Sequence, residues 1–257
     1  MARTLRDSLT RLLPSVGPLR RYFSARADLL TQLFLLLPLF IIYHVGVVAQ
    51  VRRGPDGALQ WIGNGVDFLT ASALALAGHD VATYLVGAAG ISVALTLGIL
   101  WARRGQRLHP KMFLPLLLES GVYALLTAGL IGYIVDAVGL GVLDGAGMFN
   151  QVVSSCGAGL HEELVFRAGL FHGGALLLAR VSRRPRASWL VAGLTTSVVF
   201  AAMHYLGPLG DRFTAASFVF RLLLGGVFAV LYRTRGIAVA AWTHALYDIL
   251  YFALRRL

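Results

Sequence analysis

Gly-Leu-His-Glu-Glu-Leu-Val-Phe-Arg, residues 159–167, places two adjacent glutamates and an arginine inside a segment that is otherwise apolar enough to span a membrane. A charged side chain near the middle of a bilayer costs about 2.5–3.5 kcal/mol even on lenient insertion scales. Three such charges so close together therefore need partners or a function. One alternative is structural, with the charges holding neighbouring helices together. The other is a functional site inside the membrane.

The spacing of these charges divides them into two groups on an α-helix. Glu163 and Arg167 are four residues apart with the glutamate on the N-terminal side, which is the favourable orientation for an ion pair. Glu162 points about 100° away from Glu163 and has no local partner. We therefore expect a structural ion pair between Glu163 and Arg167, with Glu162 left for another role.

The composition is that of an integral membrane protein. Hydrophobic residues make up 57% of the 257 residues and charged residues only 14%. The net charge of +11 alone would be compatible with nucleic-acid binding. The arginines, however, stand in short clusters between apolar runs, which is typical of cytoplasmic loops. We therefore expect the lipid bilayer as a partner and no nucleic acid. The single cysteine, Cys156, rules out an internal disulfide and is interpreted as a small buried residue.

The apolar runs predict an all-α polytopic bundle of about seven transmembrane helices. The predicted spans are residues 29–51, 81–101, 112–135, 149–179, 189–206, 214–232 and 237–254. Residues 61–78 are apolar but interrupted by polar residues and glycines, which favours a re-entrant or interfacial helix. Residues 1–28 are rich in arginine and leucine and predict a basic amphipathic segment at the cytoplasmic membrane surface. Residues 29–257 are expected to form a single domain.

The basic loops predict the orientation of the chain in the membrane. The clusters in 103–107, 180–186 and 233–235 fall on the same side as the basic N-terminus if 61–78 does not cross. Positively charged loops favour the cytoplasmic side, so we expect a cytoplasmic N-terminus. The C-terminal pair, residues 255–256, falls on the opposite side and disagrees with this pattern.

Two further polar pairs lie on other predicted spans, each with a spacing of four residues. Phe200 and His204 share one face of the fifth span, and His244 and Asp248 share one face of the seventh. Polar groups in a membrane bundle avoid lipid by facing inward. We therefore expect them to surround one polar cavity together with Glu162.

Such a cavity has the groups needed to hydrolyse a peptide bond. A desolvated glutamate such as Glu162 can act as general base towards water, and His204 can share the proton or pass it to the leaving amine. His244, oriented by Asp248, could stabilise negative charge on the attacked carbonyl oxygen. Two histidines with a carboxylate are also a catalytic zinc ligand set, although no His-Glu-x-x-His motif is present.

These residues resemble the three ordered motifs of the CPBP intramembrane proteases, the CAAX-protease and bacteriocin-processing family related to the Ras-converting enzyme. The resemblance covers the region 149–254, and residues 1–148 carry no such mark. It implies an intramembrane endopeptidase in which Glu162 activates water with His204. It also implies an oxyanion site at His244 and Asp248, a structural pair of Glu163 with Arg167, and Phe200 as motif support.

One departure from the family keeps the zinc alternative open. Eukaryotic members have asparagine where this chain has Asp248, and an ionised aspartate cannot donate a hydrogen bond. Asp248 is therefore expected to orient His244 or to bind a cation. We favour no cofactor; a zinc ion, if used, would be bound by Glu162, His204, His244 and Asp248.

The resemblance further implies a peptide or membrane-protein substrate and, we expect, a location in the inner (plasma) membrane of a bacterium. It does not specify the substrate or an oligomeric state. A proton-coupled transporter or channel is a different functional class that also needs inward-facing charges, and a non-catalytic scaffold is another. Glu119, in the third span, is expected to pair with Arg167 or Arg221.

Overall fold

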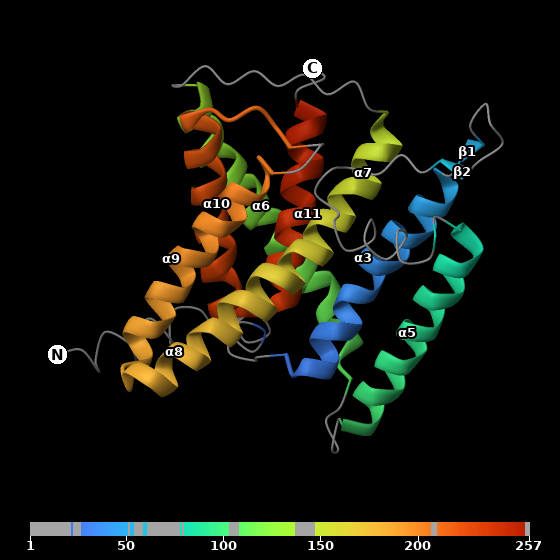
Figure 1. Ribbon diagram of the computed structural model, residues 1–257, viewed down its shortest axis with the longest axis horizontal. Coiled ribbons are helices and arrows are strands. Elements are labelled where there is room, and N and C mark those ends of the chain that lie inside the picture. The colour runs from blue at the N-terminus through green and yellow to red at the C-terminus, as the bar shows by residue number, and fades with distance from the viewer. Residues whose placement is uncertain are drawn as a thin grey trace, which may run out of the picture.

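The computed structural model describes residues 22, 27–50, 52–53, 59–60, 78, 80–102, 108–136, 147–206 and 210–254 (Figure 1). The predicted re-entrant helix at 61–78 lies outside the described residues except for Gly78. The predicted basic segment at 1–28 also lies outside them except for Tyr22, Ala27 and Asp28.

The described chain is a polytopic helical bundle. Its helices are α3 (Leu29–Ala49), α5 (Val81–Ala102), η2 (Pro110–Met112), α6 (Phe113–Asp136), α7 (Met148–Gly157), η3 (Ala158–Gly173), α8 (Gly174–Ser182), α9 (Pro185–Met203), α10 (Ala215–Arg235) and α11 (Ile237–Leu254). Two short strands, β1 (Arg52–Arg53) and β2 (Leu59–Gln60), pair antiparallel, with Arg52 opposite Gln60. The predicted all-α membrane class is confirmed, and this short ladder is its one addition in the described part of the chain.

Six helical segments in the described residues are long and apolar enough to cross a membrane. They are Leu29–Ala49, Pro110–Leu130, Met148–Ser182, Pro185–Met203, Ala215–Arg235 and Ile237–Leu254. The remaining predicted span corresponds to α5, a helix of 22 residues without a charged side chain. Each of the seven predicted segments is therefore helical.

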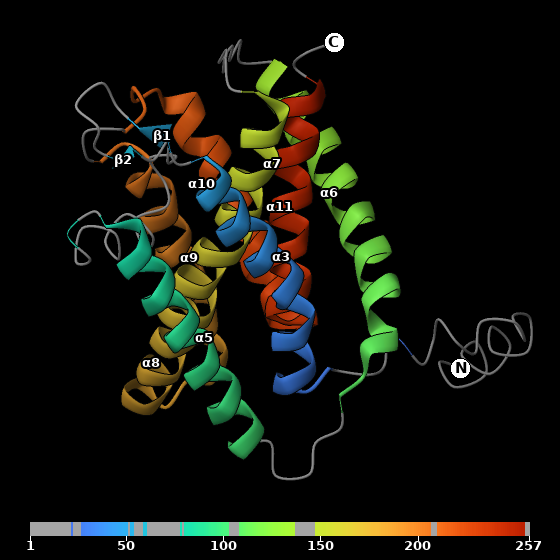
Figure 2. The same ribbon diagram turned by 90° about the vertical axis from the view of Figure 1, so that its right-hand side faces the viewer.

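α11 is the central helix of the bundle and packs against α3, α6, α7, η3 and α10. In both views α3 lies between α11 and α5, and α5 packs on α3 at the edge (Figures 1 and 2). Most of the first half of α11 is buried, including four alanines at 238, 240, 241 and 245. Small side chains at these positions allow the neighbouring helices to approach closely.

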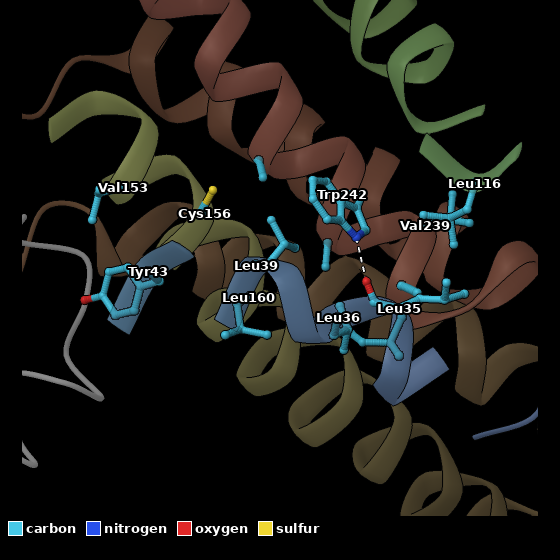
Figure 3. Close-up of a cluster of buried hydrophobic side chains, with 14 of the residues drawn as sticks. Leu35, Leu36, Leu39, Tyr43, Leu116, Val153, Cys156, Leu160, Val239 and Trp242 are labelled. Atoms are coloured by element: carbon cyan, nitrogen blue, oxygen red, sulfur yellow. Dashed lines mark hydrogen bonds between the residues drawn. The ribbon is translucent and has the colours of Figure 1, made fainter. Parts of the chain in front are cut away.

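The hydrophobic core between α3, α7 and α11 fixes the position of η3 (Figure 3). Leu35 and Leu39 of α3 are fully buried there, and Trp242 Nε1 donates a hydrogen bond to Leu35 O at 2.8 Å. Leu160, the first buried leucine of η3, belongs to the same cluster. This core therefore holds the segment with the two glutamates against α11.

Gly159 makes the approach of η3 to α11 possible. A Cβ atom at this position would lie 2.5 Å from Ala241 O and 2.9 Å from Ala245 Cβ. These distances are shorter than van der Waals contact, so only glycine fits. The next turn of η3, with its two glutamates, therefore faces α11.

The helix ends that adjoin the basic loops lie at one end of the bundle, as the sequence analysis expected. The start of α3 and the ends of α5, α8 and α10 lie together at the lower end of the bundle in Figure 1. The ends of α9 and α11 lie at the opposite end.

Candidate active site

The two glutamates lie on a π-helix, not on the α-helix that the sequence predicted. η3 runs from Ala158 to Gly173 and is continuous with α7 before it and α8 after it. A π-helix has more residues per turn than an α-helix, so successive side chains are rotated less. Glu162 and Glu163 are both buried, with exposed fractions of 2% and 0%, which agrees with the inward-facing position expected for Glu162. π-Helical segments are rare and occur frequently at functional sites.

Arg167 is fully buried beside Glu163, with Arg167 Nε 3.2 Å from Glu163 Oε2. Its guanidinium also lies against three aromatic rings. The Cζ atom is 4.6 Å from the ring centroid of Phe200 and 5.7 Å from that of Phe228. Phe166 contributes a third ring at 5.9 Å. Aromatic faces attract a desolvated cation, so these rings compensate part of the burial of the charge.

His244 lies between two carboxylates. Its Nδ1 is 2.9 Å from Glu163 Oε1, and its Nε2 is 3.6 Å from Asp248 Oδ2. The sequence predicted the partner Asp248, which is four residues away on α11, but not Glu163, which is 81 residues away. Because the carboxylate can only accept, Nδ1 donates this hydrogen bond. Glu163 therefore joins Arg167 to His244 instead of serving Arg167 alone.

Phe228 of α10 is a site residue that the sequence analysis missed. Its ring stacks on the His244 imidazole with the centroids 4.4 Å apart, and it is fully buried. An apolar residue in an apolar span has no distinguishing pattern. Only the contact of α10 with α11 reveals this role.

His204 lies directly after α9 and is half-buried. Its Nδ1 is 2.8 Å from Phe200 O. A carbonyl can only accept, so Nδ1 carries the proton of this bond and Nε2 is the nitrogen directed elsewhere. The Phe200 ring lies 5.0 Å from the His204 ring and 6.1 Å from the His244 ring, measured between centroids. Phe200 therefore contacts both histidines and Arg167.

One oxygen of Glu162 lacks the hydrogen bond that a buried carboxylate oxygen normally has. Its Oε2 atom is buried and has no hydrogen-bond partner among the described protein groups. The charged groups that act on it are His244, Asp248, Glu163 and Arg167. His204 in turn interacts electrostatically with His244. The structure thus brings Glu162, His244 and Asp248 near Glu163, and the Phe200 ring contacts both His244 and His204.

The zinc alternative would need several ligating side chains close together. Among the residues that the structure describes, no group of three or more His, Cys, Asp or Glu side chains is arranged to hold a metal ion.

Glu119 was assigned the wrong partner by the sequence analysis. It binds Arg235 of α10, with Nε–Oε1 and Nη2–Oε2 distances of 2.6 and 3.0 Å, and it accepts a hydrogen bond from Tyr22 Oη. The predicted partners are engaged elsewhere, since Arg167 pairs with Glu163 and Arg221 with Asp211. Arg235 is the last residue of α10, and the sequence analysis counted it among the arginines of a basic loop. Its pairing with Glu119 was therefore not predicted. Cys156 is buried, in agreement with its interpretation as a core residue.

Residues 144–250 match the family model described as type II CAAX prenyl endopeptidase Rce1-like. This segment is similar to that family of endopeptidases, in agreement with the resemblance to the CPBP intramembrane proteases. The matched CPBP segment contains all seven residues that the sequence analysis assigned to the site. Comparison with curated proteins found no match. Comparison with solved structures found none either. The match over 144–250 and the apolar helices support a membrane-embedded protease of the CAAX type.

Proposed function

We propose that the protein hydrolyses a peptide bond in a membrane-associated or C-terminally anchored substrate, with Glu162 as the general base. The observation that supports this assignment is the buried Glu162 Oε2 atom without a protein partner. Buried polar atoms in native proteins are almost always satisfied, so an orphaned one calls for a water molecule or substrate group. Glu163 Oε2 also lacks a hydrogen bond, but it is ion-paired with Arg167 Nε at 3.2 Å, and Glu163 Oε1 accepts from His244.

In the proposed reaction, Glu162 accepts a proton from a water molecule while the water oxygen attacks the scissile carbonyl carbon. The carbon–oxygen double bond opens, and negative charge collects on the carbonyl oxygen. His204 assists at Nε2, since its Nδ1 is engaged with Phe200 O. When the carbon–nitrogen bond breaks, the leaving amine takes a proton from His204 or Glu162, and the other product is a carboxylate.

His244 is proposed to stabilise the developing oxyanion. Its imidazole is held on three sides, by Glu163 at Nδ1, by the Phe228 ring and by Asp248 near Nε2. A donor fixed before the reaction stabilises the developing charge without reorganisation, which is the main source of such catalysis. Asp248 is 24% exposed and lies 3.6 Å from Nε2, which suits a residue that orients the imidazole.

The sequence left three alternatives to a metal-free protease: a zinc-dependent protease, a proton-coupled transporter or channel, and a scaffold. A zinc-dependent version of the same hydrolysis would have to recruit its ligands by moving side chains of the site. A proton-coupled transporter or a scaffold has no observation in its favour, because the matched family is one of endopeptidases.

We further propose that the site opens towards the outer face of a bacterial plasma membrane, with the N-terminus in the cytoplasm. His204 stands at the end of α9 away from the arginines at 183, 184 and 186. Positively charged loops favour the cytoplasm. An outward-opening site suits the trimming of a membrane anchor from an exported protein.

Single cysteines test this orientation in a Cys156→Ser background. Leu206→Cys lies beyond α9 and Val181→Cys near the end of α8, and both positions are exposed. A membrane-impermeant thiol reagent should label Leu206→Cys on intact cells and Val181→Cys only after the cells are opened. The reverse pattern would move the site to the cytoplasmic face.

The proposed activity is tested by comparing membrane proteomes of cells that express the wild type, Glu162→Gln or the control Asp80→Asn. Asp80 is an exposed carboxylate away from the site. A precursor should accumulate with Glu162→Gln and be processed with the other two. Identical proteomes for all three would contradict the proposal.

A further inference from the structure

Arg221 is a largely buried cation that has no role in the proposed mechanism. It lies near the start of α10, and its Nη1 donates to Ser217 Oγ at 2.6 Å and to Tyr205 Oη at 2.9 Å. Tyr205 Oη also donates to Ser217 Oγ at 2.8 Å, so the three groups hold one another. The Tyr205 ring lies 5.1 Å from Arg221 Cζ. One edge of the guanidinium is therefore fixed by the protein.

The other edge holds an exposed carboxylate. Arg221 Nη2 donates to Asp211 Oδ2, and the side chains of Arg221 and Asp211 are 16% and 55% exposed. Asp211 lies outside any helix, between α9 and α10. Ion pairs with such an exposed partner contribute little to stability because water competes for both charges. Asp211 is thus a partner that another carboxylate can replace.

This exchangeable pair lies beside the proposed catalytic groups. Arg221 interacts electrostatically with His204, which follows α9, and with Asp248, on α11. The Asp211 backbone N–H donates to His204 O at 2.8 Å, so the residue that occupies Arg221 is tied to the histidine. A carboxylate bound at Arg221 would lie close to the bond being cleaved.

We propose that Arg221 binds a carboxylate of the substrate, and that Asp211 occupies the guanidinium until the substrate arrives. This inference rests on the proposed function and makes Arg221 a specificity-determining residue. A guanidinium has a fork of N–H groups that matches the two oxygens of a carboxylate. The carboxylate can be the free C-terminus of a peptide or an acidic side chain near it.

Peptide binding can be measured without cleavage in the Glu162→Gln protein in lipid nanodiscs. The probe is a fluorescein-labelled peptide with a hydrophobic membrane-anchor segment at its C-terminus, and its binding is measured by fluorescence anisotropy. It is made as the free acid, as the C-terminal amide, and as the amide with glutamate in the last position. We expect the free acid to bind at least about tenfold more tightly than the amide, since charge-assisted hydrogen bonds are lost with the carboxylate. Tight binding of the glutamate amide as well would assign the site to acidic side chains in addition to the C-terminus.

Four variants in the same background separate binding from structure. Arg221→Gln should abolish the preference for the acid, and Arg221→Lys should retain part of it because the charge stays while the fork is lost. Asp211→Asn should bind the acid more tightly than the parent and leave the amide unchanged, because the competing carboxylate is gone. Arg212→Gln removes a neighbouring exposed cation and should change neither peptide.

Equal binding of acid and amide, or binding of neither, would overturn the inference. So would weaker acid binding by Asp211→Asn, which is the result expected if the pair only holds the fold, and this variant decides the question even if Arg221→Gln does not fold. The hydrolytic function is judged separately by the precursor that accumulates with Glu162→Gln, so either proposal can fail while the other stands.

Discussion

Glu163 Oε1 lies 2.9 Å from His244 Nδ1, and Glu163 Oε2 lies 3.2 Å from Arg167 Nε, so one fully buried carboxylate joins the charged residues of η3 to the histidine of α11. This relationship distinguishes the two adjacent glutamates. Both Glu163 oxygens contact a charged side chain of the protein, whereas Glu162 Oε2 is buried without a hydrogen bond or an ion pair among the described groups. We therefore expect Glu163 to stabilise the fold and Glu162 to act in catalysis.

Removal of Glu163 should be more damaging to folding than removal of Arg167. Glu163→Ala leaves both Arg167 and His244 without their carboxylate, whereas Arg167→Ala leaves Glu163 bound to His244. Breaking a buried pair from one side destabilises by about 3–5 kcal/mol. The yield of monodisperse protein and the temperature of half-unfolding in detergent measure the effect.

The double variant Glu163→Ala/Arg167→Ala provides the control for this coupling. It should be more stable than Glu163→Ala alone, because no uncompensated guanidinium remains. If the two single effects simply add, the ion pair does not contribute to folding.

Phe200→Ala should destabilise the protein and reduce proteolysis together. The ring covers Arg167 and contacts both histidines, and truncation of a buried phenylalanine typically costs about 3–5 kcal/mol. Phe149→Ala is the matched control, since Phe149 of α7 is 57% exposed on the bundle surface. Thermal unfolding and precursor processing are measured on both. Equal behaviour of the two variants would show that Phe200 is not a central site residue.

Gly159→Ala should separate η3 from α11 and lower stability by about 1–3 kcal/mol, because the new methyl group meets the backbone of α11. Gly173→Ala, at the other end of η3, has nothing within 4 Å of the added Cβ atom and should be neutral or slightly stabilising. Comparing the unfolding temperatures of the two variants tests the close contact. A loss of stability for Gly173→Ala of the same size would point to the helix itself instead.

Exhaustive chelation should leave proteolysis intact if Glu162 acts on an uncoordinated water molecule. Elemental analysis of purified active protein should then find substoichiometric zinc. Stoichiometric zinc, with activity lost on chelation and restored by zinc, would establish the metal-dependent alternative. In that case Glu162, His204, His244 and Asp248 would be the residues to test as ligands.

The fold class could be predicted from the sequence because a membrane span is recognised from a local run of apolar residues. Apolar runs such as 237–254 are long, and each coincides with a helix in the structure. The spacing of four residues likewise identified Arg167 as a neighbour of Glu163 and Asp248 as a neighbour of His244, since such pairs share a helix face.

What the sequence could not predict depends on contacts between distant helices. The hydrogen bond from His244 to Glu163 and the pairing of Glu119 with Arg235 join residues 81 and 116 positions apart. The π-helical backbone of η3 has no known local signature in the residues around Glu162, so an α-helix was expected there. The stacking of Phe228 on His244 is equally invisible, because one phenylalanine in an apolar span resembles another.

The most direct test of the account is the initial rate at which purified Glu162→Gln, in lipid nanodiscs, cleaves the precursor that accumulates in its membrane fraction. Glutamine has nearly the same shape as glutamate but cannot accept the proton from water. We predict a rate about 10²–10⁴-fold below that of the wild type, with an unchanged unfolding temperature. A folded Glu162→Gln protein that cleaves the precursor at the wild-type rate would contradict the role of Glu162 as general base.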